Sequence, residues 1–352
     1  MYRNALQSRG KVLAVAPMLD WTDRHYRYLA RLLSKRALLY TEMVVADAII
    51  HGDRERLLGF DASEHPVALQ LGGSDPAKLA EAVRIAADFG YDEINLNVGC
   101  PSDRVQSGTF GACLMQTPDV VARAVEAMKA VSSVPVTVKC RIGVDDQEPE
   151  EALPGLVVPA LDAGADAIWV HARKAWLQGL SPRENREIPP LDYGIVYRLK
   201  QRFPHVFIGI NGGILTLEAA GEHLQHVDGV MIGRAAYQNT SIMADVDAQI
   251  FGDADLAVSR EELLERMSAY CADVIQSGGK LSTVTRHMLG LFHGMPGARR
   301  YRQILSTDGP KPGAGVDVLV RAFDAMQPGE MVRRCAPFPC REAGRGPDGC
   351  GW

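Results

Sequence analysis

The chain has 352 residues, of which 47% are hydrophobic and 23% are charged. This composition is typical of a globular protein and excludes a chain that is disordered along most of its length. The formal net charge is −5, which weighs against a protein that coats nucleic acid through charge alone. No run of ~18 apolar residues occurs, so no membrane partner is expected. The seven cysteines are scattered and odd in number, which favours a cytoplasmic protein over a secreted disulfide-rich one.

Eight short apolar runs predict β-strands. They are rich in Val, Ile and Leu and show little polar alternation, as expected of strands buried on both faces. The runs are Val12–Ala16, Leu38–Thr41, Val67–Gln70, Glu93–Asn97, Val136–Lys139, Ala167–His171, Phe207–Asn211 and Gly229–Ile232. The first run is too short for the apolar part of a signal peptide.

Amphipathic helices are predicted between the strands. The segment Asp75–Phe89 has Pro76 near its start and Gly90 after its end, as helices often do. Similar segments occupy Pro118–Ala130, Leu191–Arg202 and Leu217–Leu224. Eight strand–helix units in about 230 residues predict a (β/α)₈ TIM barrel over residues 1–250. A doubly wound sheet is the alternative, but no G-x-G-x-x-G motif follows a strand.

Residues 255–327 predict a small all-helical C-terminal domain. The expected helices are Arg260–Gln276, Thr283–Leu291, Gly297–Leu305 and Val316–Met326, separated by clusters of Gly and Pro. Residues 328–352 are rich in Gly, Pro, Arg and Cys and predict a disordered tail. Its three cysteines lack a fourth ligand at zinc-finger spacing, so no metal site is predicted.

Polar residues follow the predicted strands at their carboxyl ends, where TIM barrels carry their active sites. Asn211-Gly212-Gly213 and Gly233-Arg234 follow strands seven and eight, where barrels commonly bind phosphate. Glycines let backbone N–H groups approach phosphate oxygens, and Arg234 supplies positive charge. An ordinary glycine turn is the alternative for Gly212-Gly213 alone.

Gln70, Lys139 and His171 suit a flat heterocycle at the same end of the barrel. An amide can bind a pyrimidine-like edge, and an ammonium group can stabilise negative charge on a reduced flavin. Taken alone, His171 could equally be a structural histidine whose hydrogen bonds are made within the core or a loop.

Cys100 follows strand four in the sequence Val-Gly-Cys-Pro, within a loop that continues to Gly111 and could close over a substrate. A thiol with an ordinary pKa of ~8.5 can donate a proton to a carbanion-like centre near neutral pH. Cys113, Cys140 and Cys271 are interpreted as buried apolar residues.

Eight segments resemble the tRNA-dihydrouridine synthases. They are Ala16–Asp23, Tyr40–Met43, Pro66–Gly73, Glu93–Pro101, His171–Ala175, Asn185–Leu191, Asn211–Ile214 and Thr285–Leu291. The Asn-x-Gly-Cys-Pro stretch is specific to these synthases. His-Ala-Arg-Lys-Ala-Trp and Arg-His-Met-Leu-Gly-Leu are similar to the branch that acts on U20 and U20a of the tRNA D-loop. The resemblance extends from Val12 to Phe323 and implies a flavin-dependent barrel with a helical tRNA-binding domain.

The resemblance also implies roles for individual residues. The implied FMN contacts are Pro17, Met18, Leu19, Gln70, Lys139, His171, Asn211, Gly212, Gly213, Gly233 and Arg234. The implied tRNA contacts are Asn97, Arg183, Arg186, Arg299 and Arg302. Cys100 is the implied proton donor and Lys139 a second catalytic residue. No obligate protein partner is implied.

The implied reaction reduces the C5=C6 bond of uridine to 5,6-dihydrouridine. NADPH (or NADH) reduces FMN, hydride passes from FMN N5 to uracil C6, and Cys100 protonates C5. Lys139 stabilises the charge that develops on the base. The target uridine has to leave its stacked position to reach Cys100.

Local charge is compatible with RNA binding despite the negative total. Residues 280–311 contain six basic residues and one acidic residue, and Arg299 and Arg302 share one face of a predicted helix with Tyr301 adjacent. A solvated helix face is the alternative for these arginines. Two other functions remain open from the residues: a flavin barrel acting on a free pyrimidine, such as a dihydroorotate dehydrogenase, and a non-catalytic RNA-binding protein.

Overall fold

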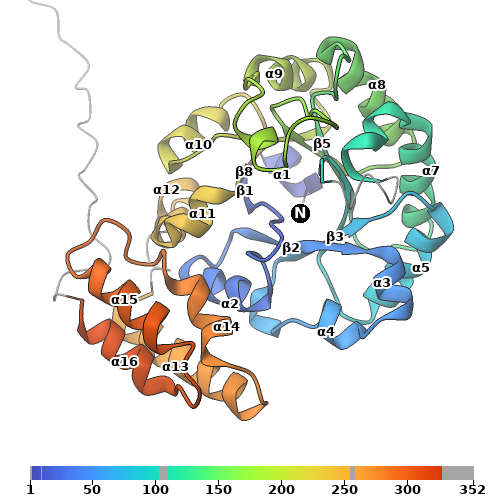
Figure 1. Cartoon of the computed structure of the whole chain (residues 1–352). Helices are drawn as coiled ribbons and strands as arrows, with labels where there is room; N and C mark the ends of the chain where they lie inside the picture. The colour runs from blue at the N-terminus through green and yellow to red at the C-terminus, as the bar shows by residue number, and fades with distance from the viewer. Residues whose placement is uncertain (1, 9, 103–109, 254–257, 327–352) are drawn as a thin grey trace, which may run out of the picture.

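The computed structural model describes residues 2–8, 10–102, 110–253 and 258–326. Its centre is a closed barrel of eight parallel strands that pair in chain order, as Figure 1 shows. The strands are β1 (Val12–Val15), β2 (Leu38–Val45), β3 (Val67–Gly72), β4 (Glu93–Val98), β5 (Val136–Arg141), β6 (Ala167–His171), β7 (Phe207–Asn211) and β8 (Gly229–Ile232). The predicted (β/α)₈ barrel is confirmed.

Alternate side chains of each strand pack into two different cores, one between the strands and the helices and one inside the barrel. In β1, Leu13 and Val15 pack outward against the helices, whereas Val12 and Ala14 face the barrel interior. The interior contains the rings of Tyr2, Tyr40, Trp169 and Phe207, and the Trp169 ring requires glycine at position 209. A Cβ added to Gly209 would lie 2.1 Å from Cε3 of Trp169.

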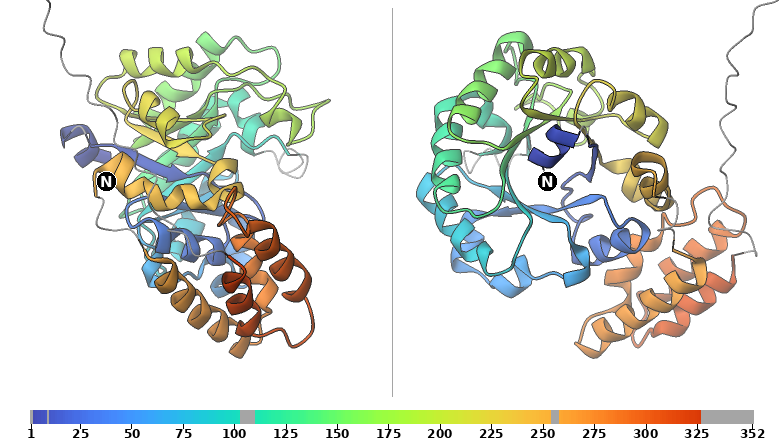
Figure 2. Two further views of the ribbon diagram at one scale, coloured as in Figure 1. Left: turned by 90° about the vertical axis from the view of Figure 1, so that its left-hand side faces the viewer. Right: turned by 180° about the vertical axis from the view of Figure 1, so that it is seen from behind.

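The short helix α1 (Tyr2–Ser8) covers the amino-terminal end of the barrel, as seen from behind in Figure 2. Tyr2 enters the barrel interior, where its ring packs edge-on against Phe207 with centroids 4.5 Å apart. The carboxyl ends of the strands therefore lie at the opposite end of the barrel, with the polar residues singled out above.

A ring of helices surrounds the strands (Figure 1). The longer ones are α2 (Arg24–Leu33), α5 (Pro76–Ala87), α7 (Pro118–Lys129), α8 (Pro149–Asp162) and α9 (Tyr193–Arg202). Shorter ones are α3 (Ala46–His51), α4 (Arg54–Leu58), α10 (Leu217–His223), α11 (Arg234–Gln238) and α12 (Val246–Phe251).

Helix starts follow capping side chains. Asp75 accepts hydrogen bonds from two backbone N–H groups of α5, and Asp192 accepts one from α9. The second cap explains why α9 begins two residues after the predicted start at Leu191.

The helices of residues 260–324 lie beside the barrel, next to α2 (Figure 1). They are α13 (Arg260–Gln276), α14 (Leu281–Thr285), α15 (Ala298–Asp308) and α16 (Val316–Asp324). Phe292, Tyr301 and Phe323 form an edge-to-face aromatic cluster in their core. Tyr301 is fully buried, so the expectation that it lies beside Arg299 and Arg302 at an RNA contact is wrong.

The predicted helix Thr283–Leu291 is also wrong in its extent. Helix α14 ends at Thr285 and is followed by a single 3₁₀ turn, Arg286–Met288. Arg286 Nη2 and His287 Nε2 both contact the carboxylate of Asp23, which also caps α2, at 2.6 and 3.0 Å. This contact with the barrel depends on the tertiary structure and is absent from the local sequence pattern.

Within the described residues no helix is long and apolar enough to cross a membrane. The tail predicted to be disordered, 328–352, lies outside the residues that the structure describes.

Candidate active site

Three neighbouring strands bring Lys139, His171 and Asn211 together at the carboxyl end of the barrel. Arg141 of β5 pairs in register with His171 of β6, which pairs with Asn211 of β7. Lys139 Nζ donates to Asn211 Oδ1 at 3.2 Å, and Asn211 Nδ2 donates to the carbonyl oxygen of Met231 at 2.8 Å. The structure thus joins three residues that the sequence predicts as cofactor contacts.

The charge of Lys139 has little compensation in its surroundings. Burial and, to a smaller extent, the charge of Arg141 lower the pKa of Lys139 to about 8, while the Cys140 and Cys100 thiols act in the opposite direction. Burial, with Arg141 and Lys139 nearby, also lowers the pKa of His171 well below its usual range. A half-buried ammonium whose one hydrogen bond within the described residues is to the amide oxygen of Asn211 suits a ligand that carries negative charge on a ring. This environment fits a reduced flavin.

The loop after β7 comes close to the neighbouring side chains. Gly212 and Gly213 have φ angles of 118° and 69°, which disfavour residues with a side chain. A Cβ on Gly212 would lie 2.6 Å from Cδ2 of His171, and one on Gly213 would lie 2.5 Å from Cδ1 of Leu191. The glycines therefore let the loop backbone lie close to His171 and Leu191, and a glycine backbone of this kind can approach phosphate oxygens.

Closure of the barrel brings the loop after β1 next to the loop after β8. A Cβ on Gly233 would meet Ala16 at 3.6 Å and Met18 Sδ at 3.7 Å. Pro17 and Met18 are half-buried there, while Leu19 is 70% exposed. These residues border the same end of the barrel as Lys139.

Arg234 has a protein partner in this structure. Its Nη1 atom contacts Glu187 Oε1 at 2.7 Å, and its Nη2 atom donates to the carbonyl oxygen of Arg186 at 3.3 Å. The same carboxylate lies 3.7 Å from Arg183 Nε. An arginine predicted to bind phosphate and an arginine predicted to bind tRNA therefore share one acidic side chain.

Cys100 is half-buried at the end of β4, with its loop fixed from both sides. Asn97 Oδ1 accepts hydrogen bonds from the N–H groups of Gly99 and Cys100 at 3.1 and 2.9 Å. Arg141 Nε donates to the carbonyl oxygen of Gly99 at 2.9 Å. The Cys100 thiol donates to Ser102 Oγ at 3.6 Å. The following residues, 103–109, lie outside the described part of the chain.

Gln70 and Asn97 lie deeper than the sequence predicts. Gln70 is 1% exposed. Its Nε2 atom donates to Asn95 Oδ1 at 2.8 Å, and its Oε1 atom accepts from Asn97 Nδ2 at 2.7 Å. In this structure both side chains connect neighbouring strands and support the Cys100 loop.

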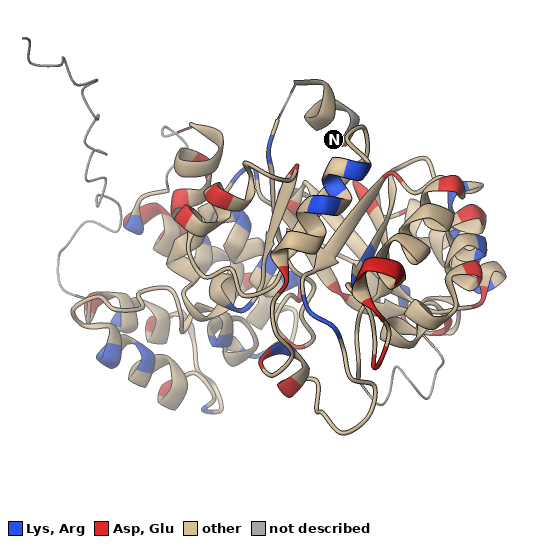
Figure 3. Cartoon of the chain, turned by 90° about the horizontal axis from the view of Figure 1, so that it is seen from above, with Lys and Arg blue, Asp and Glu red and all other residues tan. Residues whose placement is uncertain are grey.

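The four arginines predicted to bind tRNA are all exposed, in two groups. Arg183 and Arg186 flank Asn185 in the loop after β6, and Arg299 and Arg302 lie on α15. Acidic and basic residues alternate along the helices and loops around the barrel (Figure 3).

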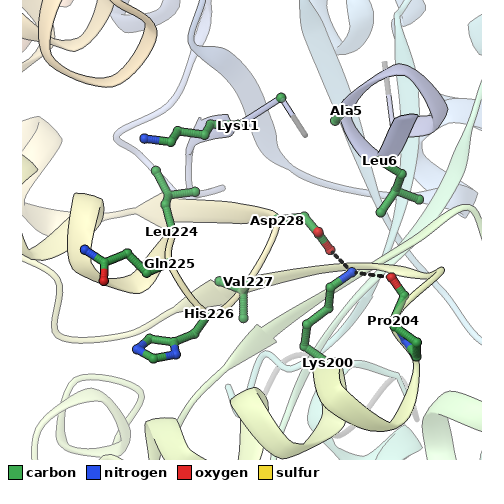
Figure 4. Close-up of a pocket in the computed structure, with 11 residues that line it drawn as sticks. Ala5, Leu6, Lys11, Lys200, Pro204, Leu224, Gln225, His226, Val227 and Asp228 are labelled. Atoms are coloured by element: carbon green, nitrogen blue, oxygen red, sulfur yellow. Dashed lines mark hydrogen bonds and ion pairs between the residues drawn. The ribbon is translucent and has the colours of Figure 1, made fainter. Parts of the chain in front are cut away.

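A pocket at the opposite end of the barrel is lined by one ion pair and by Lys11 (Figure 4). It lies beside α1, and its Lys200 Nζ contacts Asp228 Oδ2 at 2.8 Å and the carbonyl oxygen of Pro204 at 2.9 Å. The pocket contains none of the residues predicted to be catalytic.

The family model described as Dihydrouridine synthase (Dus) matches residues 14–325. The chain belongs to the dihydrouridine synthase family. It is 55% identical over 324 residues to the tRNA-dihydrouridine(20/20a) synthase of Shewanella oneidensis, covering 92% of this chain and 96% of the relative. It is 56% identical over 312 residues to the protein of that name from Vibrio cholerae, covering 88% and 95%. It is 57% identical over 311 residues to the one from Escherichia coli K12, covering 88% and 90%. The resemblance inferred from the motifs is confirmed.

Two further residues, Arg141 and Asn185, hold the loops at this end of the barrel. Arg141 Nη1 donates to the carbonyl oxygens of Lys174 and Asn185, at 2.9 and 3.0 Å, in addition to the contact with Gly99. Asn185 is fully buried and bonds the backbone of Trp176 in both directions. Arg141 could have been found from its spacing, because residues two apart on a strand face the same side and Lys139 was already a candidate.

Proposed function

We propose that the chain reduces the C5=C6 bond of uridine to 5,6-dihydrouridine at positions 20 and 20a of the tRNA D-loop. The names of the three relatives support the reaction and the positions. The observation that carries the proposal is the pairing of β4 with β5, in which Asn97 lies in register with Lys139. A proton donor three residues beyond Asn97 and an ammonium group thus approach one end of the barrel.

The proposal includes FMN as the bound cofactor and NADPH (or NADH) as the reductant. When bound, reduced FMN supplies the hydride that uracil C6 receives. The proposed site is bordered by Pro17, Met18, Leu19 and Gly233. The side chains assigned to the flavin ring are those of Gln70, Lys139, His171 and Asn211. The phosphate would be held by Gly212, Gly213 and Arg234. Arg234 would then leave its ion pair with Glu187 and bind the phosphate instead.

The protein's own residues perform the acid and electrostatic parts of the reaction. Reduction at C6 places negative charge on C5 and, by conjugation, on the C4 oxygen. The Lys139 ammonium stabilises this charge in surroundings of low polarity, where its effect is larger than in water. Cys100 then donates its thiol proton to C5. Asn97 and Arg141 keep the loop of Cys100 in place during this step.

Binding of tRNA is assigned to the exposed arginines. Arg183 and Arg186 lie beside the catalytic end of the barrel, and Arg299 and Arg302 extend the basic surface onto residues 255–327, the proposed tRNA-binding domain. Contacts of this kind with phosphates orient an RNA without reading its sequence. Residues 1–250 would then be the catalytic barrel of a cytoplasmic enzyme.

The decisive experiment uses purified protein, NADPH and an unmodified tRNA transcript. We expect flavin absorbance that is released on denaturation and dihydrouridine that maps to positions 20 and 20a. Dihydrouridine elsewhere in the tRNA would overturn the positional assignment. Reduction of free pyrimidines without reduction of tRNA would favour the dihydroorotate dehydrogenase-like alternative.

A further inference from the structure

A chain of buried side chains runs along the inside of the barrel from its closed end to Cys100. Its members come from strands β2 to β5 and are all at most 8% exposed. They are Tyr40, Glu93, Thr137, Asn95, Gln70 and Asn97. Glu93 begins β4, and the Cys100 loop follows the end of the same strand. The chain therefore connects the two ends of the barrel through side chains alone.

Glu93 is the hydrogen-bond acceptor at the closed end. Tyr2 and Thr137 donate to its two carboxylate oxygens, and Tyr40 donates to Oε1 at 2.5 Å. Burial raises the pKa of Glu93 to about 7, while the bonds from Thr137, Tyr2 and Tyr40 act in the opposite direction. Three hydroxyl donors converging on one carboxyl group are the arrangement that stabilises its ionised form.

The orientation of each following group depends on the one before it. Because the Thr137 hydroxyl donates to Glu93, its oxygen is left to accept from Asn95 Nδ2, at 2.7 Å. Asn95 Oδ1 then accepts from Gln70 Nε2 at 2.8 Å. Gln70 Oε1 in turn accepts from Asn97 Nδ2 at 2.7 Å.

The last amide in the chain acts on the catalytic loop. With its nitrogen bonded to Gln70, Asn97 presents Oδ1 to the N–H groups of Gly99 and Cys100. A reversed Asn97 amide would present a donor to these two donors, and the loop would lose both bonds. The direction of the first hydrogen bond therefore determines whether the last two can form.

We propose that Glu93 is a positioning residue that acts through Thr137, Asn95, Gln70 and Asn97 to fix the loop carrying Cys100. The role of that loop in catalysis rests on the proposed function, whereas the effect on its backbone does not. A carboxyl group far from the substrate thus orients every amide between the closed end of the barrel and the reacting thiol.

The alternative is that Glu93 only stabilises the barrel interior. Two substitutions distinguish the alternatives, because each removes one hydroxyl donor to the same carboxylate oxygen. Thr137→Val keeps the side-chain shape and cuts the connection to Asn95, whereas Tyr40→Phe leaves that connection intact. A merely structural role predicts similar effects of the two variants on the Cys100 loop.

Amide hydrogen exchange of the purified protein, without tRNA or reductant, is the first measurement. We expect Thr137→Val to speed exchange at Gly99 and Cys100 about tenfold, as the loss of one hydrogen bond would, and Tyr40→Phe to leave it unchanged. Exchange in α7, which packs against β5, reports on the stability of the barrel and should be equal in the two variants. Glu93→Gln should retain slow exchange at the loop, because its amide oxygen can still accept from Thr137 and Tyr40.

The second measurement is the single-turnover rate of dihydrouridine formation by the reduced holoprotein. We expect a fall of about tenfold for Thr137→Val and little change for Tyr40→Phe. Equal exchange at the loop in the two variants would overturn the proposal, even if the wild type makes dihydrouridine. If the wild type makes none while the loop still responds to Thr137→Val alone, the proposed function fails and the positioning role stands.

Discussion

Arg141 Nε donates a hydrogen bond to the carbonyl oxygen of Gly99 at 2.9 Å, one residue before the proposed proton donor. The same guanidinium group bonds the carbonyl oxygens of Lys174 and Asn185, and Arg141 is only 3% exposed. One buried side chain thereby joins the Cys100 loop to the loop that carries Arg183 and Arg186. The rigid fork of arginine can satisfy three carbonyl groups at once, which a lysine cannot do with the same geometry.

Arg141→Lys should therefore weaken catalysis more than folding. We expect the single-turnover rate to fall by about 10- to 100-fold and the free energy of unfolding to fall by about 1 to 3 kcal/mol. Rapid-quench measurements and denaturant titration test these values. Arg27→Lys, which alters a buried arginine paired with Glu64 away from the site, is the matched control. A rate that falls equally in both variants would contradict a specific role for Arg141.

Lys139→Met should stabilise the cofactor-free protein while abolishing its reaction. The pKa of Lys139 is lowered from 10.5 to about 8 by burial, so the unfolded chain holds this proton more tightly. The cost is present below pH 8 and is relieved as the pH rises from 8 towards 10.5. Near pH 7 we expect the variant to gain about 1 to 3 kcal/mol in the free energy of unfolding.

Urea titrations of both proteins from pH 7 to pH 10 measure this difference, which should shrink as the pH rises. Lys129→Met is the control, because Lys129 contacts Asp166 at 2.7 Å and its loss should not stabilise the chain. A lower stability of Lys139→Met at pH 7 would show that the ammonium group is better compensated than its contacts indicate.

Cys100→Ala should retain FMN and lose dihydrouridine formation. The thiol is the proposed proton source for C5, and general acids contribute roughly 10²- to 10⁴-fold to such steps. Single-turnover reactions with tRNA measure the loss, and flavin absorbance measures cofactor content. The control is Cys113→Ala, which should react at nearly the wild-type rate. Cys113 is a second half-buried cysteine, and its thiol donates to the carbonyl oxygen of Phe110. An unchanged rate for Cys100→Ala would remove the assigned role.

Replacing Arg299 and Arg302 together by alanine should weaken tRNA binding without affecting flavin reduction. Both side chains are exposed on α15, three residues apart on one face. Removing two phosphate contacts should reduce the slope of log K against log salt by about 1 to 2. Binding assays at several salt concentrations test this, with Arg300→Ala as the control on a different face of the helix. Equal tRNA affinity of the double variant and the wild type would contradict the assignment.

Glu187→Gln should strengthen FMN binding modestly. In this structure Glu187 Oε1 contacts Arg234 Nη1 at 2.7 Å. A cofactor phosphate that binds Arg234 has to replace this carboxylate. An exposed ion pair contributes up to ~1 kcal/mol, so we expect at most about a fivefold gain in affinity. Flavin fluorescence during titration of the cofactor-free protein measures it. Glu184→Gln, which alters the carboxylate that bonds Ser181 N, should have no effect. Weaker binding by Glu187→Gln would indicate that the pair orients Arg234.

The barrel could be predicted because each of its strands is recognisable from a short segment of the sequence. Each strand is a short run of Val, Ile and Leu, and the eight runs occur in the order in which the strands pair. The helix starts at Asp75 and Asp192 also reflect local capping. The 3₁₀ turn at Arg286–Met288 could not be predicted, because the contact with Asp23 that accompanies it joins residues more than 260 positions apart.

By itself, the sequence determined the order of elements, the family and the placing of Cys100, Lys139 and His171 at strand ends, because strand periodicity and motif spacing are properties of short segments. The tertiary structure decided which polar groups are joined: Glu93 to Thr137, Arg141 to carbonyl groups of two loops, and Arg234 to Glu187. These contacts depend on the register with which the barrel closes and on the paths of the loops above it. Neither is encoded in the spacing of residues along a single element.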